Sequence, residues 1–409
     1  MKRSLSAAAC VLAILAALLV LGGRVGVAEE KHNYEVHEWS VWIADPTLPA
    51  INSQVHYPSA LPGESLRSRR LPSGEKRPSP ISMLTFYGEP LSDLEIELQL
   101  PAGRWLGHFP TGEIKGQRLR WLELALVPEL RDKAQLGYIS QDHWFQRARR
   151  VGGLYVRRGE RLEHFLAYDA ELTMQPPVKL QGGPDAYEVT NQSGGPLYDV
   201  LISEASSAGR RIGWLDELPV ASAASGKPAA TAPGAAAATA GGAIKPPSAA
   251  QVSMSAVLKP ASPELMAAST TELTKRLEKA GLNPEEAGLL LAQYQAAIFE
   301  SDEMVVVVRL APTTLEEKMP HTYYPEPQRR VRVALVLVRN VDPKVAGEVQ
   351  KLIAQLGDPS YAQREAAQKR LTELGPLAAR AVNEALTNPD PEIVSRAESI
   401  LLEQKQPRK

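Results

Sequence analysis

The sequence contains one cysteine, Cys10, in 409 residues. It lies within an N-terminal apolar run, so removal of that run leaves a chain without disulfides, thiolate nucleophiles or cysteine metal ligands. Net charge is also nearly absent, at −1, which argues against nucleic acid as a partner. The Gly-x-Ser-x-Gly, His-Glu-x-x-His and glycine-rich phosphate-binding motifs are missing, which counts against common hydrolases and nucleotide enzymes.

The N-terminus carries the pattern of an export signal. Lys2 and Arg3 precede an apolar run, and Gly26-Val27-Ala28 places small residues before Glu29. This pattern predicts a signal peptide over residues 1–28, with cleavage after Ala28. The alternative is an uncleaved anchor, although the run is short for a membrane span. Cleavage leaves 43 basic against 47 acidic residues and no predicted membrane span. We therefore expect an exported protein of the periplasm or cell envelope, or a secreted one.

Short β-strand patterns fill residues 29–220. The segment from Leu94 to Leu100 alternates strictly between apolar and polar residues, as a half-buried strand does. Further short apolar segments are separated by glycine- and proline-rich turns, such as residues 181–185 and 193–196. Such spacing predicts an antiparallel β-sandwich.

Residues 221–262 differ in composition. Alanine makes up fourteen of the thirty residues from Ala221 to Ala250, interleaved with helix-breaking proline and glycine. We therefore expect a disordered linker or loop. Residues 263–341 then predict a helical hairpin, opened by Ser262 and Asn283 as caps, and two apolar strands that return to the β domain.

Residues 342–409 change to a helical period. Their apolar stripes are interrupted at Gly357, Gly375 and Asn388, which predicts four helices. Arg364 and Arg396 occupy matching helices about 32 residues apart, a period typical of stacked helix pairs. The tail resembles HEAT-type repeats. The predicted fold is therefore multidomain α+β: an N-terminal antiparallel β-sandwich with a helical insertion, and a C-terminal HEAT-like helical array.

Several segments together resemble one protein group, and they are listed here: 35–42, 143–149, 210–217, 336–343 and the helical tail. On the basis of these segments, the chain resembles exported proteins of planctomycete-type bacteria that end in a HEAT-like segment. The resemblance would cover nearly all of the chain after the signal. It implies no activity and no catalytic residues.

Five polar residues are the candidates for chemistry: His37, Glu38, Asp142, His143 and Asp216. A β-strand sends the first two to opposite faces, so they cannot readily bind one ion together. One of them could still meet His143 and Asp216 as a carboxylate–imidazole metal site. The alternative is that all five form structural hydrogen bonds. We predict no metal and no cofactor.

Trp144, Arg147 and Arg149 are the candidates for ligand binding. All six tryptophans precede the linker, and Trp144 lies among polar residues, where an exposed ring could stack on a sugar. The arginines could contact an anionic polymer, or could simply protect a strand edge.

The sequence thus favours an exported binding or scaffold protein, with the helical tail contacting another envelope protein. It leaves open whether the protein is an enzyme. The alternatives are a hydrolase of envelope polysaccharide or peptide, and a carbohydrate-binding β-sandwich. Clustering of the five polar candidates would favour the hydrolase.

Overall fold

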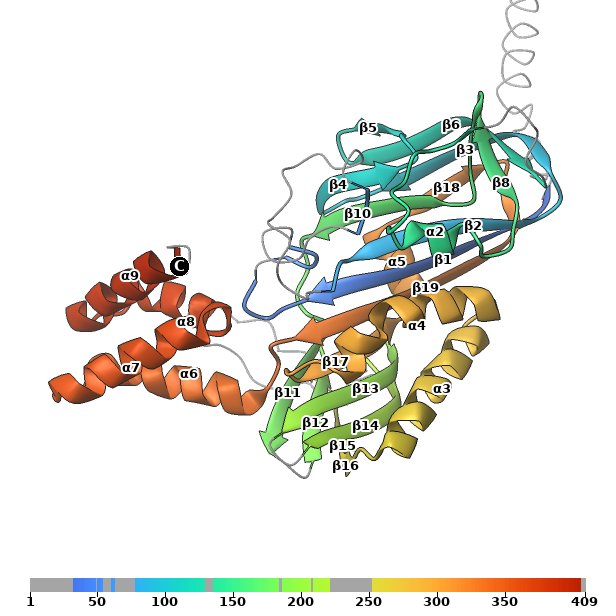
Figure 1. Ribbon diagram of the computed structural model, residues 1–409. Helices are drawn as coiled ribbons and strands as arrows, with labels where there is room; N and C mark the ends of the chain where they lie inside the picture. The colour runs from blue at the N-terminus through green and yellow to red at the C-terminus, as the bar shows by residue number, and fades with distance from the viewer. Residues whose placement is uncertain are drawn as a thin grey trace, which may run out of the picture.

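The computed structural model describes residues 32–48, 50–53, 60–62, 78–128, 135–183, 186–206, 209–220 and 252–405. Within these ranges the chain is a mixed α+β protein, in which large sheets occupy the N-terminal part and helices the C-terminus (Figure 1). The predicted signal peptide and the alanine-rich stretch 221–250 lie outside the described residues.

We call the described residues from His32 to Val341 the β unit, and a nine-stranded sheet forms its centre. Its strands, in spatial order, are β16 (Lys259–Pro260), β14 (Gly209–Leu218), β13 (Leu197–Ser206), β17 (Val305–Leu310), β19 (Pro327–Arg339), β1 (His32–Ala44), β2 (Ile81–Gly88), β10 (Leu166–Leu172) and β4 (Gly103–Phe109). The strands β17 and β19 therefore lie between β13 and β1. Their apolar sequences suit this position, because both of their faces are buried.

The expected antiparallel pairing is wrong for the central pair of this sheet. Strands β1 and β19 run parallel, with Glu38 opposite Arg332 and Trp42 opposite Val336. Neighbours in a hairpin must be antiparallel, but strands joined by a long crossover can be parallel. Nearly the whole β unit separates β1 from β19 along the chain, so local sequence could not specify their direction.

Two smaller sheets complete the β unit. One contains β18 (His321–Tyr324), β3 (Leu91–Gln99), β6 (Arg118–Val127), β8 (Tyr155–Arg158), β9 (Arg161–Glu163) and β7 (Gln135–Leu136), with β5 (Glu113–Lys115) paired to β6. The other contains β11 (Val178–Gly183), β12 (Ala186–Asn191) and β15 (Ser253–Val257). One face of the nine-stranded sheet shares an apolar core with both, in which Trp42 and Val336 pack together with Ile96 and Tyr187.

Helices cover the opposite face of the nine-stranded sheet. These are α3 (Pro263–Lys279), α4 (Pro284–Phe299) and the short α2 (Phe145–Ala148), and their core includes Trp39, Leu335, Leu290 and Ile298. Helix α3 begins as its sequence predicts, since Ser262 Oγ accepts a hydrogen bond from the Leu265 amide at 3.2 Å. Another short helix, α5 (Pro312–Lys318), connects β17 to β18.

The described residues begin again at residue 252, before the predicted end of the linker at residue 262. Residues 253–257 and 259–260 form β15 and β16, and Ala256 and Leu258 are buried. The alternation of small polar and apolar residues here is a strand pattern, but its proximity to the alanine-rich stretch concealed it.

The four C-terminal helices are α6 (Pro343–Gln355), α7 (Tyr361–Leu374), α8 (Pro376–Ala385) and α9 (Pro391–Lys405). They extend from the end of β19 to one side of the β unit (Figure 1). Val349, Leu371, Val382 and Ala397 belong to a core that is separate from the two cores of the β unit.

Candidate functional site

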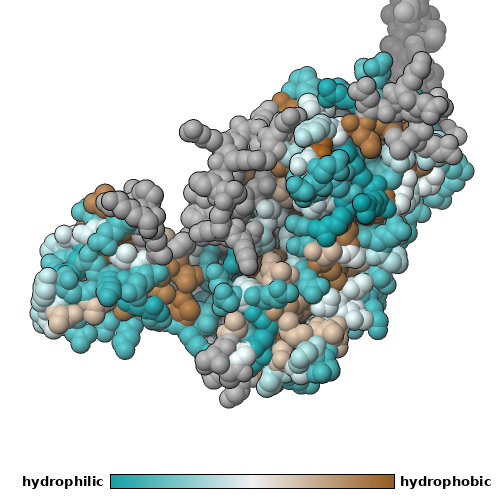
Figure 2. Space-filling model, viewed as in Figure 1, coloured by the Kyte–Doolittle hydropathy of each residue, from teal (hydrophilic) through white to brown (hydrophobic). Residues whose placement is uncertain are grey.

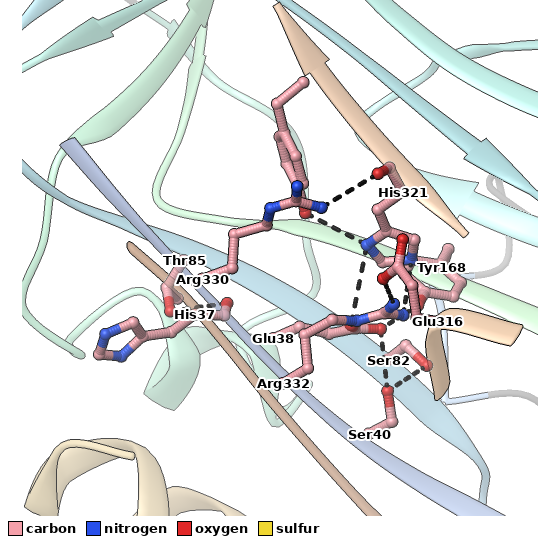
Figure 3. Close-up of polar contacts among 11 residues, drawn as sticks. His37, Glu38, Ser40, Ser82, Thr85, Tyr168, Glu316, His321, Arg330 and Arg332 are labelled. Atoms are coloured by element: carbon pink, nitrogen blue, oxygen red, sulfur yellow. Dashed lines mark hydrogen bonds and ion pairs between the residues drawn. The ribbon is translucent and has the colours of Figure 1, made fainter. Parts of the chain in front are cut away.

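Strand β1 places neighbouring side chains in two different environments. Glu38 faces the core between the sheets, and His37 faces helix α4, as the alternation of a strand requires. Each residue is buried and belongs to a polar cluster. Figure 3 shows the two side chains pointing away from one another.

The Glu38 cluster consists of Glu38, Arg332, Tyr168, His321 and Ser40 (Figure 3). The carboxylate of Glu38 accepts hydrogen bonds from Arg332 Nε and Tyr168 Oη, and it lies 3.7 Å from Nδ1 of His321. Ser40 Oγ donates to the same carboxylate at 3.4 Å. The cluster therefore connects β1, β10, β18 and β19, which belong to two sheets.

Arg332 keeps Glu38 ionised inside the core. Burial by itself raises the pKa of a carboxyl group, but the positive charge of Arg332 and the hydrogen bonds to Glu38 outweigh it and lower the pKa of Glu38 to about 2. Arg332 also donates to Glu316 Oε2 at 2.7 Å, and the side chain of Glu316 is 47% exposed. The buried arginine thus has one partner in the core and one at the surface.

His321 is the neutral member of the cluster. Burial, together with the charges of Arg332 and Arg330, lowers the pKa of His321 to about 3, although Glu38 acts in the opposite direction. Arg332 Nη2 lies 3.1 Å from Nε2 of His321, and an arginine can only donate, so Nε2 must accept. The proton is therefore on Nδ1, which lies 3.2 Å from the Tyr323 hydroxyl.

The chemistry open to the Glu38 cluster is limited. A general acid or base works best when its pKa is near the working pH, but Glu38 and His321 titrate far below neutrality. Their polar atoms are engaged with one another in a closed core. This arrangement can hold strands together, and neither Glu38 nor His321 exchanges a proton near neutral pH.

The His37 cluster joins strands β1 and β2 to helix α4. It consists of His37, Glu286, Thr85 and Tyr87, and Glu286 Oε2 lies 2.9 Å from His37 Nδ1. Tyr87 Oη donates to Glu286 Oε1 at 2.9 Å, and Thr85 Oγ1 donates to the same oxygen. Glu286 also closes the capping box of α4 by accepting from the Asn283 amide at 2.9 Å. Burial raises the pKa of Glu286. The hydrogen bonds from His37 and from the other donors outweigh burial, so the pKa of Glu286 is lowered overall.

Asp142, His143 and Trp144 lie immediately before α2. Asp142 is exposed, and the ring of His143 accepts a hydrogen bond from the Phe145 amide at 3.2 Å. Trp144 is half-buried, with its ring centroid 4.6 Å from Phe145 and 6.2 Å from Trp39. Trp144 thus packs, partly buried, against the core on the helix-covered face of the sheet.

The remaining candidates occupy other positions. Arg276 of α3 donates to Asp216 Oδ1 at 2.7 Å and its guanidinium lies 4.8 Å from the Trp214 ring, which fastens the helix to β14. Arg149 donates to buried Glu163, with its Nε 3.0 Å from Oε1. Arg147 is an exposed residue of α2.

The five polar candidates therefore have different partners and do not form one site. Within the described ranges, no three His, Cys, Asp or Glu side chains are placed to hold a metal ion. Sequence reasoning missed Arg332, His321 and Tyr168 as partners of Glu38. The available signal was Arg332 itself, a charged residue within an otherwise apolar strand.

Comparisons with known proteins found no match, either among protein-family models or among curated proteins. The function must therefore be inferred from the residues of this chain. None of the helices in the described segments is long and apolar enough to cross a membrane.

Proposed function

We propose that this protein is an exported binding or scaffold protein of the bacterial cell envelope. In this proposal a β-sandwich unit carries a HEAT-like helical array, and the array contacts another envelope protein. Helical arrays of this type expose grooves and ridges that suit protein partners. Export rests on the signal pattern of residues 1–28.

A surface group on the C-terminal helices carries this proposal. Tyr361 is 64% exposed. The guanidinium groups of Arg364 and Arg396, whose side chains are 20% and 12% exposed, lie 5.7 and 5.8 Å from the centroid of its ring. Tyrosine and arginine are the residue types that most often dominate binding energy at protein interfaces. We call Tyr361, Arg364 and Arg396 the Tyr361 patch.

The Tyr361 patch is held in place before any partner binds. Glu392 of α9 lies 2.9 Å from Arg364 Nε and accepts a hydrogen bond from Arg396 Nε at 2.7 Å. One carboxylate thereby fixes two arginines from two helices. Preorganised side chains lose less conformational entropy on binding, which favours affinity. The face of these helices that Figure 2 shows is mostly hydrophilic.

The attachment of the helices to the β unit leaves the patch open. Arg380 Nη1 donates to the Pro46 carbonyl at 2.9 Å, and Lys344 Nζ lies 3.3 Å from buried Glu204. Neither contact involves Tyr361 or the two arginines of the patch. A partner can therefore approach the patch without displacing the β unit.

Crosslinking in the producing cell tests this proposal. The full-length protein is crosslinked, purified and analysed by mass spectrometry, alongside Tyr361→Ala and Tyr138→Ala variants. Tyr138 is a suitable control because it is an 81% exposed tyrosine of the β unit. We expect one envelope protein with the wild type and with Tyr138→Ala, and at least about tenfold less of it with Tyr361→Ala. Equal recovery with all three proteins would overturn the assignment of the patch.

The mass of the purified protein tests export separately. Cleavage after Ala28 gives a chain that begins at Glu29, whereas an anchored protein retains Met1. Recovery of uncleaved protein from the cytoplasm would contradict the envelope location.

A further inference from the structure

A pocket of about 980 Å³ lies on the β unit, and its lining includes none of the residues of the two buried clusters. The lining comes from the loop after β4, from β6, from residues 136–138 and from the hairpin of β8 and β9. Pockets of this size commonly accommodate small ligands.

The walls of the pocket are fixed by hydrogen bonds between segments. Arg158 Nη1, on the hairpin, donates to the Thr111 carbonyl of the opposite loop at 3.0 Å. Arg149 holds Glu163 and also donates to the Gly137 carbonyl at 2.5 Å, which ties two further parts of the lining together. Arg149 is therefore a positioning residue for this pocket. The pocket does not depend on a ligand to bring its walls together.

Glu123, one of the lining residues, lies in a β-bulge of β6. The register of β6 against β3 changes between the pair Leu94–Leu124 and the pair Ile96–Trp121, so β6 contains one extra residue there. Glu123 has φ +56° in this bulge, a left-handed conformation that is unfavourable for residues other than glycine. Bulges of this kind re-aim side chains and are frequent beside binding sites.

The charges of the lining point to an uncharged ligand. Two exposed carboxylates, Glu123 and Glu160, are balanced by Arg158 and Arg161, and Glu163 is already paired with Arg149. Among the described residues, Glu123, Glu160 and Arg161 have no ion-pair partner. These groups are therefore available to hydrogen-bond a ligand that carries both donors and acceptors.

The apolar part of the lining suits the faces of a ring. Phe109, Leu124 and Leu162 form a buried floor, and Tyr138 contributes an aromatic ring at the surface. A sugar ring combines apolar faces, which pack on aromatic rings, with hydroxyl groups that pair with carboxylates and guanidinium groups.

We propose that this pocket binds a neutral oligosaccharide, with Tyr138 stacking on a sugar ring and Glu123, Glu160 and Arg161 hydrogen-bonding its hydroxyl groups. This goes beyond the proposed protein contact, and it places carbohydrate recognition away from Trp144. Trp144 is half-buried against Trp39 and is not part of the pocket lining.

Isothermal titration of the full-length protein tests the proposal. The probes are cellohexaose, chitohexaose, xylohexaose and mannohexaose, and we expect saturable binding of at least one of them. Tyr138→Ala should weaken that binding at least about tenfold, because it removes the stacking ring. Tyr324→Ala should leave the affinity unchanged, because Tyr324 is a 67% exposed tyrosine of β18 that lies outside the pocket lining.

Glu123→Gly is the decisive second variant. Glycine adopts the left-handed backbone readily, so this variant should unfold at the same temperature as the wild type or a higher one, while losing affinity at least about tenfold. Unchanged affinity in Glu123→Gly or Tyr138→Ala would overturn the proposal. Absence of saturable binding by all four sugars would also overturn it, and neither outcome would affect the assignment of the Tyr361 patch.

Discussion

Glu38 and Arg332 lie directly opposite one another on adjacent parallel strands, although 294 residues separate them in the sequence. Both side chains are buried, and each supplies the countercharge that the other requires. Removing one partner from such a pair leaves an uncompensated charge in the core. This destabilises the folded protein by more than the intact pair stabilises it.

Arg332→Met and Glu38→Met should each destabilise the protein by about 3–5 kcal/mol, because each leaves a buried charge without its partner. The double variant Glu38→Met/Arg332→Met removes both charges and should recover much of that loss. Urea unfolding of the four proteins measures these differences. A double variant whose destabilisation equals the sum of the two single values would show that the two residues do not interact.

Acidification should destabilise the protein through His321. Its pKa is about 3 in the folded protein against an ordinary value of 6.5, so below pH 6.5 the unfolded chain takes up a proton that the folded protein refuses. This contribution is complete above pH 6.5 and is lost at up to about 1.4 kcal/mol per pH unit as the pH falls towards 3. Glu38, with a lowered pKa of about 2, adds a further loss as the pH falls from its ordinary value of 4.5.

His321→Gln isolates that contribution. A glutamine oxygen can accept the hydrogen bond from Arg332 but does not titrate, so the variant should lose less stability than the wild type between pH 6.5 and pH 5. Urea unfolding at a series of pH values measures the two slopes. Parallel slopes would show that another group is responsible for the acid sensitivity.

Glu286→Ala should cost about 3–5 kcal/mol. It removes the capping box of α4 and leaves the donors of Thr85, Tyr87 and His37 unsatisfied in a buried place. Its neighbour Glu285 is the matched control, since it accepts one exposed hydrogen bond from the Gly152 amide at 2.8 Å. Glu285→Ala should cost at most about 1 kcal/mol. Thermal unfolding compares them, and equal losses would mean that the buried contacts contribute nothing.

Leu371→Asp should unfold the C-terminal helices, because Leu371 is fully buried in their separate core. Leu402→Asp is the control, since Leu402 is 63% exposed on α9. Far-ultraviolet circular dichroism should show a large loss of helical signal only for the first variant. A chain that ends at Val341 should keep its strand signal, and failure of that chain to fold would show that the C-terminal helices are required by the β unit.

The elements that sequence reasoning located best carry their own periodic pattern. Strand β3 is an example, since its buried residues Leu94, Ile96 and Leu98 alternate with polar ones. Helix α4 is another, because Asn283, Pro284 and Glu286 form a start signal within a few residues. Strand β4 was missed, because two glycines and a mixture of polar and aromatic residues give Gly103–Phe109 no clear period.

The buried polar clusters could not be predicted for a different reason. Each joins residues that are close in space only because β19 or α4 packs beside β1, and no local pattern encodes that. The capping box of Glu286 is a local pattern, but its contact with His37 spans 249 residues. Glu123 illustrates the same limit, since its bulge exists only in the pairing of β6 with β3.

The parallel pairing of β1 and β19 also sets the order of events during synthesis. Strand β1 cannot pair with β19 until Pro327–Arg339 has been synthesised. The centre of the largest sheet therefore cannot assemble until most of the chain has left the ribosome. Pairings so distant in sequence form slowly, because loop closure precedes the contacts that reward it. A nascent chain that postpones its core in this way suits the export that we propose for this protein.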